Sequence, residues 1–152
     1  TLGTDALDAA TTDGTLPTIV GGEAVGVHLS GSGDTIDIFA YTIDDGVAAK
    51  SSGKLDNTNT TVNTFLIAGK IKWAPTGSDD SLWLFNITNP LSDAPSEAMA
   101  FATMTADLDQ SQFDTLAMAN RQISSVDEIR FALSFEETVG REPRRGLIVI
   151  VK

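Results

Sequence analysis

The chain has 152 residues, with 21 acidic and 10 basic side chains, a formal net charge of -11 at pH 7 and no cysteine. The length suits one domain with a hydrophobic core, and the lack of cysteine excludes disulfides, thiolate metal sites and cysteine nucleophiles. The acidic balance argues against nucleic-acid binding, and no apolar run approaches the roughly 20 residues of a membrane-spanning helix.

The chain shows β-type patterns from residue 24 onward. Short stretches alternate apolar with polar or small side chains and end at clusters of Gly, Asp, Asn and Pro. The expected strands are residues 24–29, 36–41, 62–73, 82–87, 98–105, 113–119 and 126–134. Residues 50–61 are polar and predict a long loop, and residues 135–139 predict one helical turn. The pattern favours an all-β fold, either a sandwich or a barrel.

Three segments follow from this pattern. Residues 1–23 form an N-terminal arm or lead-in strand, residues 24–139 form the sandwich, and residues 140–152 form a basic linker with a strand-like tail. Residues 141–152 hold four basic side chains and one acidic one, so the rest of the chain is more acidic than the net charge suggests.

Three segments carry a family resemblance. Residues 65–73 (FLIAGKIKW), 79–86 (DDSLWLFN) and 126–130 (VDEIR) resemble strands of concanavalin A-like jelly rolls, most closely laminin G-like domains of bacterial secreted and surface proteins. The resemblance covers about residues 24–139. It implies an antiparallel two-sheet β-sandwich of jelly-roll type, extracellular or on the cell surface, that binds glycans or proteins without catalysis. The ending at residues 146–151 departs from this family, and we expect either an edge or terminal strand or the remnant of an anchor. The sandwich is short for this family, which suggests a borrowed strand.

Catalytic patterns are weak. The one histidine, His28, lies on an alternating strand, and the chain has no Gly-x-Ser-x-Gly motif for a serine nucleophile. Glycosidases of related folds carry alternating acids on one strand, whereas Asp127 and Glu128 are adjacent and point to opposite faces. We therefore expect no enzymatic activity.

Calcium is the candidate cofactor, supported mainly by the family resemblance. Asp107 and Asp109 have a spacing suited to oxygen ligands, although the segment is not an EF-hand loop. The alternative is ordinary turn chemistry, because Asp side chains bind their own backbone in turns.

Sugar binding requires an exposed aromatic ring beside polar groups. Tyr41 with Asp44 and Asp45 is the preferred ligand-binding set, because Trp73 and Trp83 lie in apolar strand patterns that favour burial.

The tail supplies the other hypothesis. A flat apolar run flanked by basic groups is suited to pair with an exposed sheet edge, either its own or that of a neighbour. The assembly residues are Leu147, Ile148, Val149, Ile150 and Val151. The sequence thus predicts a recognition or adhesion module that binds a glycan or surface protein. The alternative is a structural subunit of a surface layer or filament, a homo-oligomer assembled by strand exchange.

Overall fold

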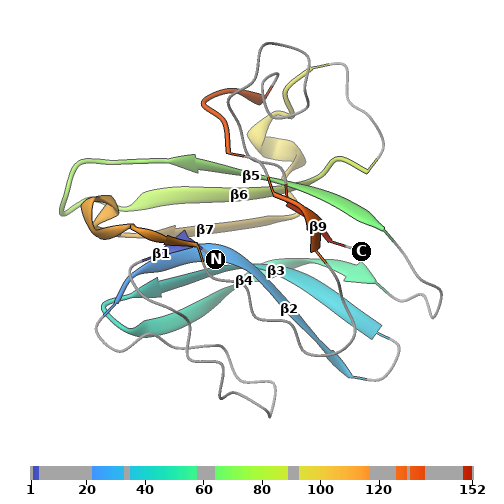
Figure 1. Cartoon of the computed structure of the whole chain (residues 1–152), viewed down its shortest axis with the longest axis horizontal. Helices are drawn as coiled ribbons and strands as arrows, with labels where there is room; N and C mark the ends of the chain where they lie inside the picture. Colours follow the sequence, from blue (N-terminus) through green and yellow to red (C-terminus); the bar gives the residue numbers. More distant parts are fainter. Residues whose placement is uncertain are drawn as a thin grey trace.

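The computed structural model describes residues 2–3, 22–32, 35–57, 64–88, 93–116, 126–129, 131–135 and 149–151. They are mostly β-strand with almost no helix, which confirms the predicted all-β class (Figure 1). In chain order the elements are β1 (Leu2–Gly3), β2 (Ala24–Ser32), β3 (Thr35–Asp44), β4 (Val47–Asn57), β5 (Phe65–Lys72), β6 (Asp80–Asn86), η1 (Glu97–Met99), β7 (Ala102–Ala106), η2 (Gln110–Gln112), β8 (Thr115–Leu116), β9 (Val126–Glu128) and β10 (Val149–Val151).

The strands form two antiparallel sheets, which lie as two layers in Figure 1. One sheet has the order β4-β3-β2-β1-β8 and the other has the order β7-β6-β5-β10-β9. The longer strands pair with their neighbours in the chain, β2 with β3, β3 with β4, β5 with β6, and β6 with β7. These pairings set which side chains share a face.

A hydrophobic core lies between the two sheets. Because successive side chains of a strand point to opposite faces, alternate residues of β2, β3, β5, β6 and β7 meet there. The buried members of this core are Val25, Ile38, Ala40, Ile67, Leu82, Leu84, Ala102 and Leu108.

The outer faces of both sheets are also partly buried. Phe39, Tyr41 and Ile43 are buried on the face of β3 that points away from this core. On the outer side of β5 and β6, a separate cluster is covered by segments that include η1 and residues 131–135 (Figure 1). Its buried members are Ala68, Phe85 and Ile87, with Leu66, Trp83, Ala100 and Phe135 packed against them.

The predicted loop at residues 50–61 is wrong over most of its length, because β4 extends through Asn57. The mostly polar composition of this segment gave no apolar alternation that would predict a strand. It is an edge strand of its sheet, and its side chains are mostly polar and exposed, as at Lys50, Ser52 and Lys54. Its stability comes from backbone pairing with β3 rather than from an apolar face.

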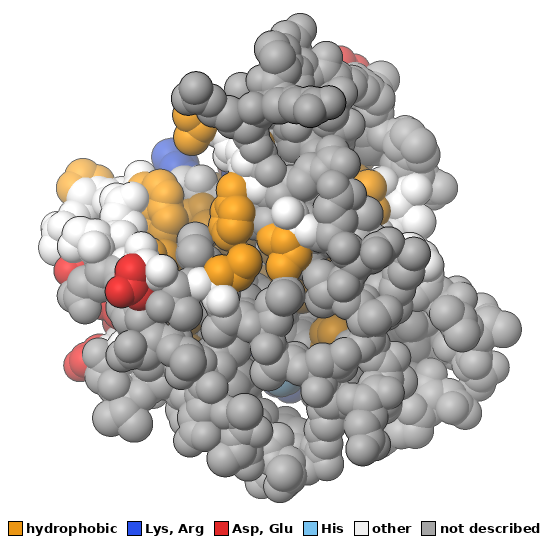
Figure 2. Space-filling model, in the orientation of Figure 1, with side chains coloured by type: hydrophobic (Ala, Val, Ile, Leu, Met, Phe, Trp, Pro, Cys, Tyr) orange, Lys and Arg blue, Asp and Glu red, His pale blue; other side chains and the backbone are white. Residues whose placement is uncertain are grey.

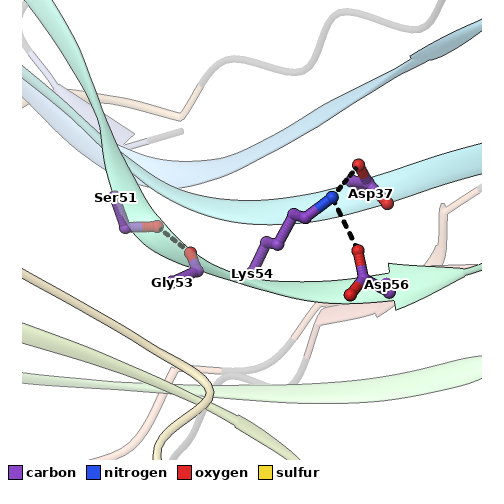
Figure 3. Close-up of polar contacts among 5 residues, drawn as sticks. All are labelled: Asp37, Ser51, Gly53, Lys54 and Asp56. Atoms are coloured by element: carbon purple, nitrogen blue, oxygen red, sulfur yellow. Dashed lines mark hydrogen bonds and ion pairs between the residues drawn. The ribbon is translucent and has the colours of Figure 1, made fainter.

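An irregularity in the pairing of β3 with β4 brings β4 close to the second sheet. Opposite the register shift, the Ser51 hydroxyl accepts from the Ala40 N–H at 3.1 Å. It donates to the Gly53 carbonyl at 2.5 Å (Figure 3). A Cβ atom added at Gly53 would lie 2.6 Å from the Phe101 carbonyl oxygen. Glycine at this position therefore permits the backbones of the two sheets to approach each other.

Lys54 forms a small ion network on the outer face of the same sheet. Its Nζ lies 2.7 Å from Asp37 Oδ2 on β3 and 2.6 Å from Asp56 Oδ1 on β4 (Figure 3). Exposed pairs of this kind contribute little to stability.

Short strands near the chain ends occupy interior positions in both sheets. β1 pairs with β2 and β8, and β10 pairs with β5 and β9. Three of the predicted assembly residues, Val149, Ile150 and Val151, therefore pair within the chain's own sheet, whereas Leu147 and Ile148 lie outside the described residues.

The predicted helical turn at residues 135–139 is described only at Phe135, which is helical. Most of the arm predicted over residues 1–23 lies outside the described residues. Leu2 and Gly3 form β1, and Gly22 and Glu23 directly precede β2.

A buried carboxylate fixes the start of β6. Asp80 is 3% exposed, and its Oδ1 accepts from the Ala74 N–H at 2.6 Å while its Oδ2 accepts from the Leu108 N–H at 3.0 Å. One side chain thus binds the segment that follows β5 and the segment that follows β7. Charge-assisted hydrogen bonds to backbone donors are stronger than neutral ones.

We predict that Asp80→Ala lowers the free energy of unfolding by about 2–3 kcal/mol, because it leaves two backbone N–H donors without their acceptor. Urea unfolding followed by circular dichroism measures this. Asp79→Ala is the matched control, because Asp79 is the exposed neighbour, and it should cost under about 0.5 kcal/mol. Equal stability of the two variants would contradict the role given to Asp80.

Candidate functional site

The structure does not support Tyr41, Asp44 and Asp45 as one exposed site. Tyr41 is 1% exposed, so the expectation of an exposed ring is wrong. It packs with Ala24 and Ile43 on the outer face of β3, and burial raises the pKa of its hydroxyl. The strand looked half-exposed in sequence, whereas both of its faces are buried.

Asp44 and Asp45 instead belong to a hairpin turn. Asp45 and Gly46 both have positive φ, 45° and 78°, and they join β3 to β4. A two-residue Asp-Gly turn of this kind matches the twist of the paired strands. This geometry explains the Asp-Gly pair without a ligand.

Asp107 and Asp109 bind backbone groups. Asp107 Oδ1 accepts from the Gly77 N–H at 3.0 Å. Asp109 Oδ1 accepts from the Ser111 N–H at 3.1 Å and from the Ser111 hydroxyl at 2.5 Å, which caps η2. Within the described ranges, no group of three or more His, Cys, Asp or Glu residues is placed to hold a metal ion. These hydrogen bonds of Asp107 and Asp109 are typical of turn and cap residues.

Acidic side chains gather at the end of the molecule where η2 lies (Figure 2). The carboxylate of Glu23 accepts from the Asp109 N–H, and the charges of Asp44, Asp107 and Asp109 act on it. Burial, followed by these like charges, raises the pKa of Glu23, although the hydrogen bond from Asp109 acts in the opposite direction.

His28 lies in an aromatic environment on the outer face of the first sheet. Its ring centroid is 6.4 Å from that of Phe39 and 6.0 Å from that of Tyr41. Burial, together with the nearby Lys50, lowers the pKa of His28 and favours the neutral ring. These contacts are structural, and they place no nucleophile against the imidazole.

The most distinctive polar surface is the outer side of β5, β6 and β7. We call it the Trp83 face and define it by the outward side chains of these strands, Lys70, Lys72, Ser81, Trp83, Thr103 and Thr105. The register pairs them in two rows, one joining Lys70, Trp83 and Thr103, and the other joining Lys72, Ser81 and Thr105. The aromatic ring thus stands among hydroxyl and ammonium groups on adjacent strands.

Trp83 is half-buried, and its surroundings fix its position. The ring packs against the cluster of Ala68, Phe85 and Ile87. The Lys70 Nζ lies 5.1 Å from the ring centroid and 2.6 Å from Glu97 Oε1 of η1. Apolar packing therefore fixes the position of the ring, and the Lys70 ammonium lies over its face.

An open depression on this face is lined by Ser81, Trp83, Thr103, Met104 and Thr105. Such a surface offers an apolar ring for stacking together with hydroxyls that both donate and accept hydrogen bonds. Because the groups lie on paired strands, their spacing is set before any ligand arrives.

This face was not predicted from the sequence, because the apolar strand pattern around Trp83 favours burial. No local signal identifies it, because residues 82–85 (LWLF) are apolar on both faces of β6, with Leu82 and Leu84 toward the core and Trp83 outward. The other tryptophan, Trp73, follows β5. It is 36% exposed and meets Phe113 edge to face at 5.6 Å, so it is less buried than its strand pattern predicts.

Comparison of the chain with protein-family models, curated proteins and solved structures gave no match. No helix in the part of the chain that the structure describes is long and apolar enough to cross a membrane.

We predict that Glu23→Gln stabilises the protein at pH 7 by up to about 1 kcal/mol, a limit set by solvent screening. Because the folded-state pKa is raised, the stability that Glu23 contributes is present below the unfolded value of 4.5 and is lost as pH rises through the folded pKa. Glutamine keeps an acceptor for the Asp109 N–H and removes the repulsion.

Thermal unfolding at pH 7 and at pH 4 measures the effect, with the exposed Asp45→Asn as control. The gain from Glu23→Gln should be present at pH 7 and absent at pH 4. A variant that is less stable than the wild type at pH 7 would contradict this interpretation.

Proposed function

We propose that the chain is a non-catalytic recognition module, a β-sandwich of jelly-roll type that works outside the cell and binds a glycan through the Trp83 face. The observation that carries the proposal is the position of Trp83. It is half-buried beside the apolar cluster of Ala68, Phe85 and Ile87, with hydroxyl groups on β7 and lysines on β5.

The chemistry of this face suits sugars. The CH groups of a pyranose ring stack on an aromatic plane, and the sugar hydroxyls exchange hydrogen bonds with serine and threonine side chains. Trp83 is fixed by packing against Phe85 and Ala68, so little side-chain entropy is lost when it contacts a ligand. A rigid platform of this kind recognises a repeating polymer without needing a deep pocket.

The family resemblance of residues 65–73, 79–86 and 126–130 supports the same assignment. The first two segments include all of β5 and all of β6, the strands that carry Lys70, Lys72, Ser81 and Trp83. Two layered sheets with a shared core are compatible with a jelly roll, and the proposed extracellular location follows from this resemblance.

A second candidate, a filament or surface-layer subunit assembled by strand exchange, is favoured by the terminal strands. β1 and β10 are two and three residues long, and each fills an interior position between two strands of the same chain. A short terminal strand in such a position can be replaced by the same strand of another copy. A monomer at all concentrations in sedimentation analysis would reject this candidate.

We predict that Trp83→Ala weakens binding to immobilised polysaccharides by tenfold or more, about 1.4 kcal/mol, because a central aromatic anchor is lost. Affinity electrophoresis against a panel of neutral and acidic polysaccharides identifies the ligand and measures the loss. Trp73→Ala is the matched control, because Trp73 does not belong to the Trp83 face, and it should bind as the wild type does.

Circular dichroism of both variants verifies that the sheets are intact. The proposal fails if the wild type binds no polysaccharide of the panel, or if folded Trp83→Ala binds as tightly as the wild type.

A further inference from the structure

We propose that the ligand of the Trp83 face is an anionic glycan, whose carboxylate or sulfate groups bind Lys70 and Lys72 while a sugar ring stacks on Trp83. This inference rests on the proposed function and specifies its ligand class.

The charge of this face is opposite to that of the protein. The chain carries a net charge of -11, yet the two charged side chains that define the Trp83 face are both lysines of β5. The other residues that define this face, Ser81, Trp83, Thr103 and Thr105, are neutral. A local cationic surface on an acidic protein indicates a site for an anion.

Lys72 is the cation available to a ligand. Its side chain is exposed at the end of β5, and it pairs across the sheet with Ser81 rather than with an acid. Lys72 has no ion-pair partner within the residues that the structure describes. In contrast, Lys54 on the other sheet is neutralised by Asp37 and Asp56.

Lys70 already holds an anion. Its Nζ contacts Glu97 Oε1 at 2.6 Å and lies 5.1 Å from the centre of the Trp83 ring. Both partners of this pair are exposed. A ligand carboxylate or sulfate that displaces the Glu97 carboxylate from Lys70 therefore exchanges one charged contact for an equivalent one. The contact with Glu97 thus marks where a ligand anion would lie, directly beside the ring.

A neutral glycan fits the same arrangement less well. It offers no charge to compete with Glu97, so Lys70 stays over the ring and restricts access to its face. An anionic sugar draws the ammonium toward its own charge and gains contacts to both lysines. The spacing of Lys70 and Lys72, two residues apart on one strand face, suits adjacent charged groups of a polymer.

The test uses polymers that differ only in charge. Polygalacturonate is compared with its methyl ester, and dextran sulfate is compared with dextran, by affinity electrophoresis of the full chain. We expect at least one charged polymer to bind fivefold or more tightly than its neutral counterpart, and the two pairs distinguish carboxylate from sulfate. Equal binding of both members in both pairs would overturn the inference.

Substitutions then assign the preference to the face. Lys72→Gln should remove most of the preference for the charged polymer, measured as the ratio of its affinity to that of the neutral counterpart. Glu97→Gln should tighten binding of the charged polymer, because it removes the competing carboxylate. Lys54→Gln is the control and should have no effect.

The experiments distinguish failure of the proposed glycan binding from failure of the proposed charge recognition. If Trp83→Ala loses binding while Lys72→Gln keeps the full preference, the face binds glycans but the assignment of charge recognition is wrong. If Trp83→Ala, shown to be folded, binds every polymer as the wild type does, the proposed function fails and the anionic ligand of this face fails with it.

Discussion

The buried carboxylate of Asp80 connects β6 to the segments that follow β5 and β7, and these three strands carry the Trp83 face. It accepts one N–H from Ala74, after β5, and one from Leu108, after β7, and it stands at the first residue of β6. Both neighbours of β6 are thereby anchored to its start, which helps fix the register. A slip of one residue in β6 would turn Trp83 into the core and Leu82 outward.

The second constraint is the close approach of the two sheets at Gly53. Only a residue without a Cβ fits against the Phe101 carbonyl, directly before β7. The irregular pairing at Ser51 positions this glycine and supplies an acceptor for the Ala40 N–H. The opposite sheet therefore contacts the layer of β5, β6 and β7 directly before β7. The Trp83 face lies on the other side of this layer.

Much of the strand framework was predictable, because β2, β3 and β5 alternate apolar with polar or small side chains and β6 is a short continuous apolar run. β4 could not be predicted in this way, because an edge strand held by backbone hydrogen bonds needs no apolar pattern. The exposure of Tyr41 was predicted wrongly, and the partial exposure of Trp83 was not predicted. The exposure of Tyr41 and Trp83 depends on what covers each outer sheet face, and such long-range packing leaves no local signal in the residues around either ring.

The most direct test of the account is an NMR titration of the full chain with the polysaccharide fragment that it binds. The account predicts shifts of the Trp83 indole N–H and of amides in β5, β6 and β7, with the signals of Trp73 and of the turn at Asp45 unchanged. Shifts confined to that turn, or to the segment from Asp107 to Ser111, with Trp83 unchanged, would contradict it.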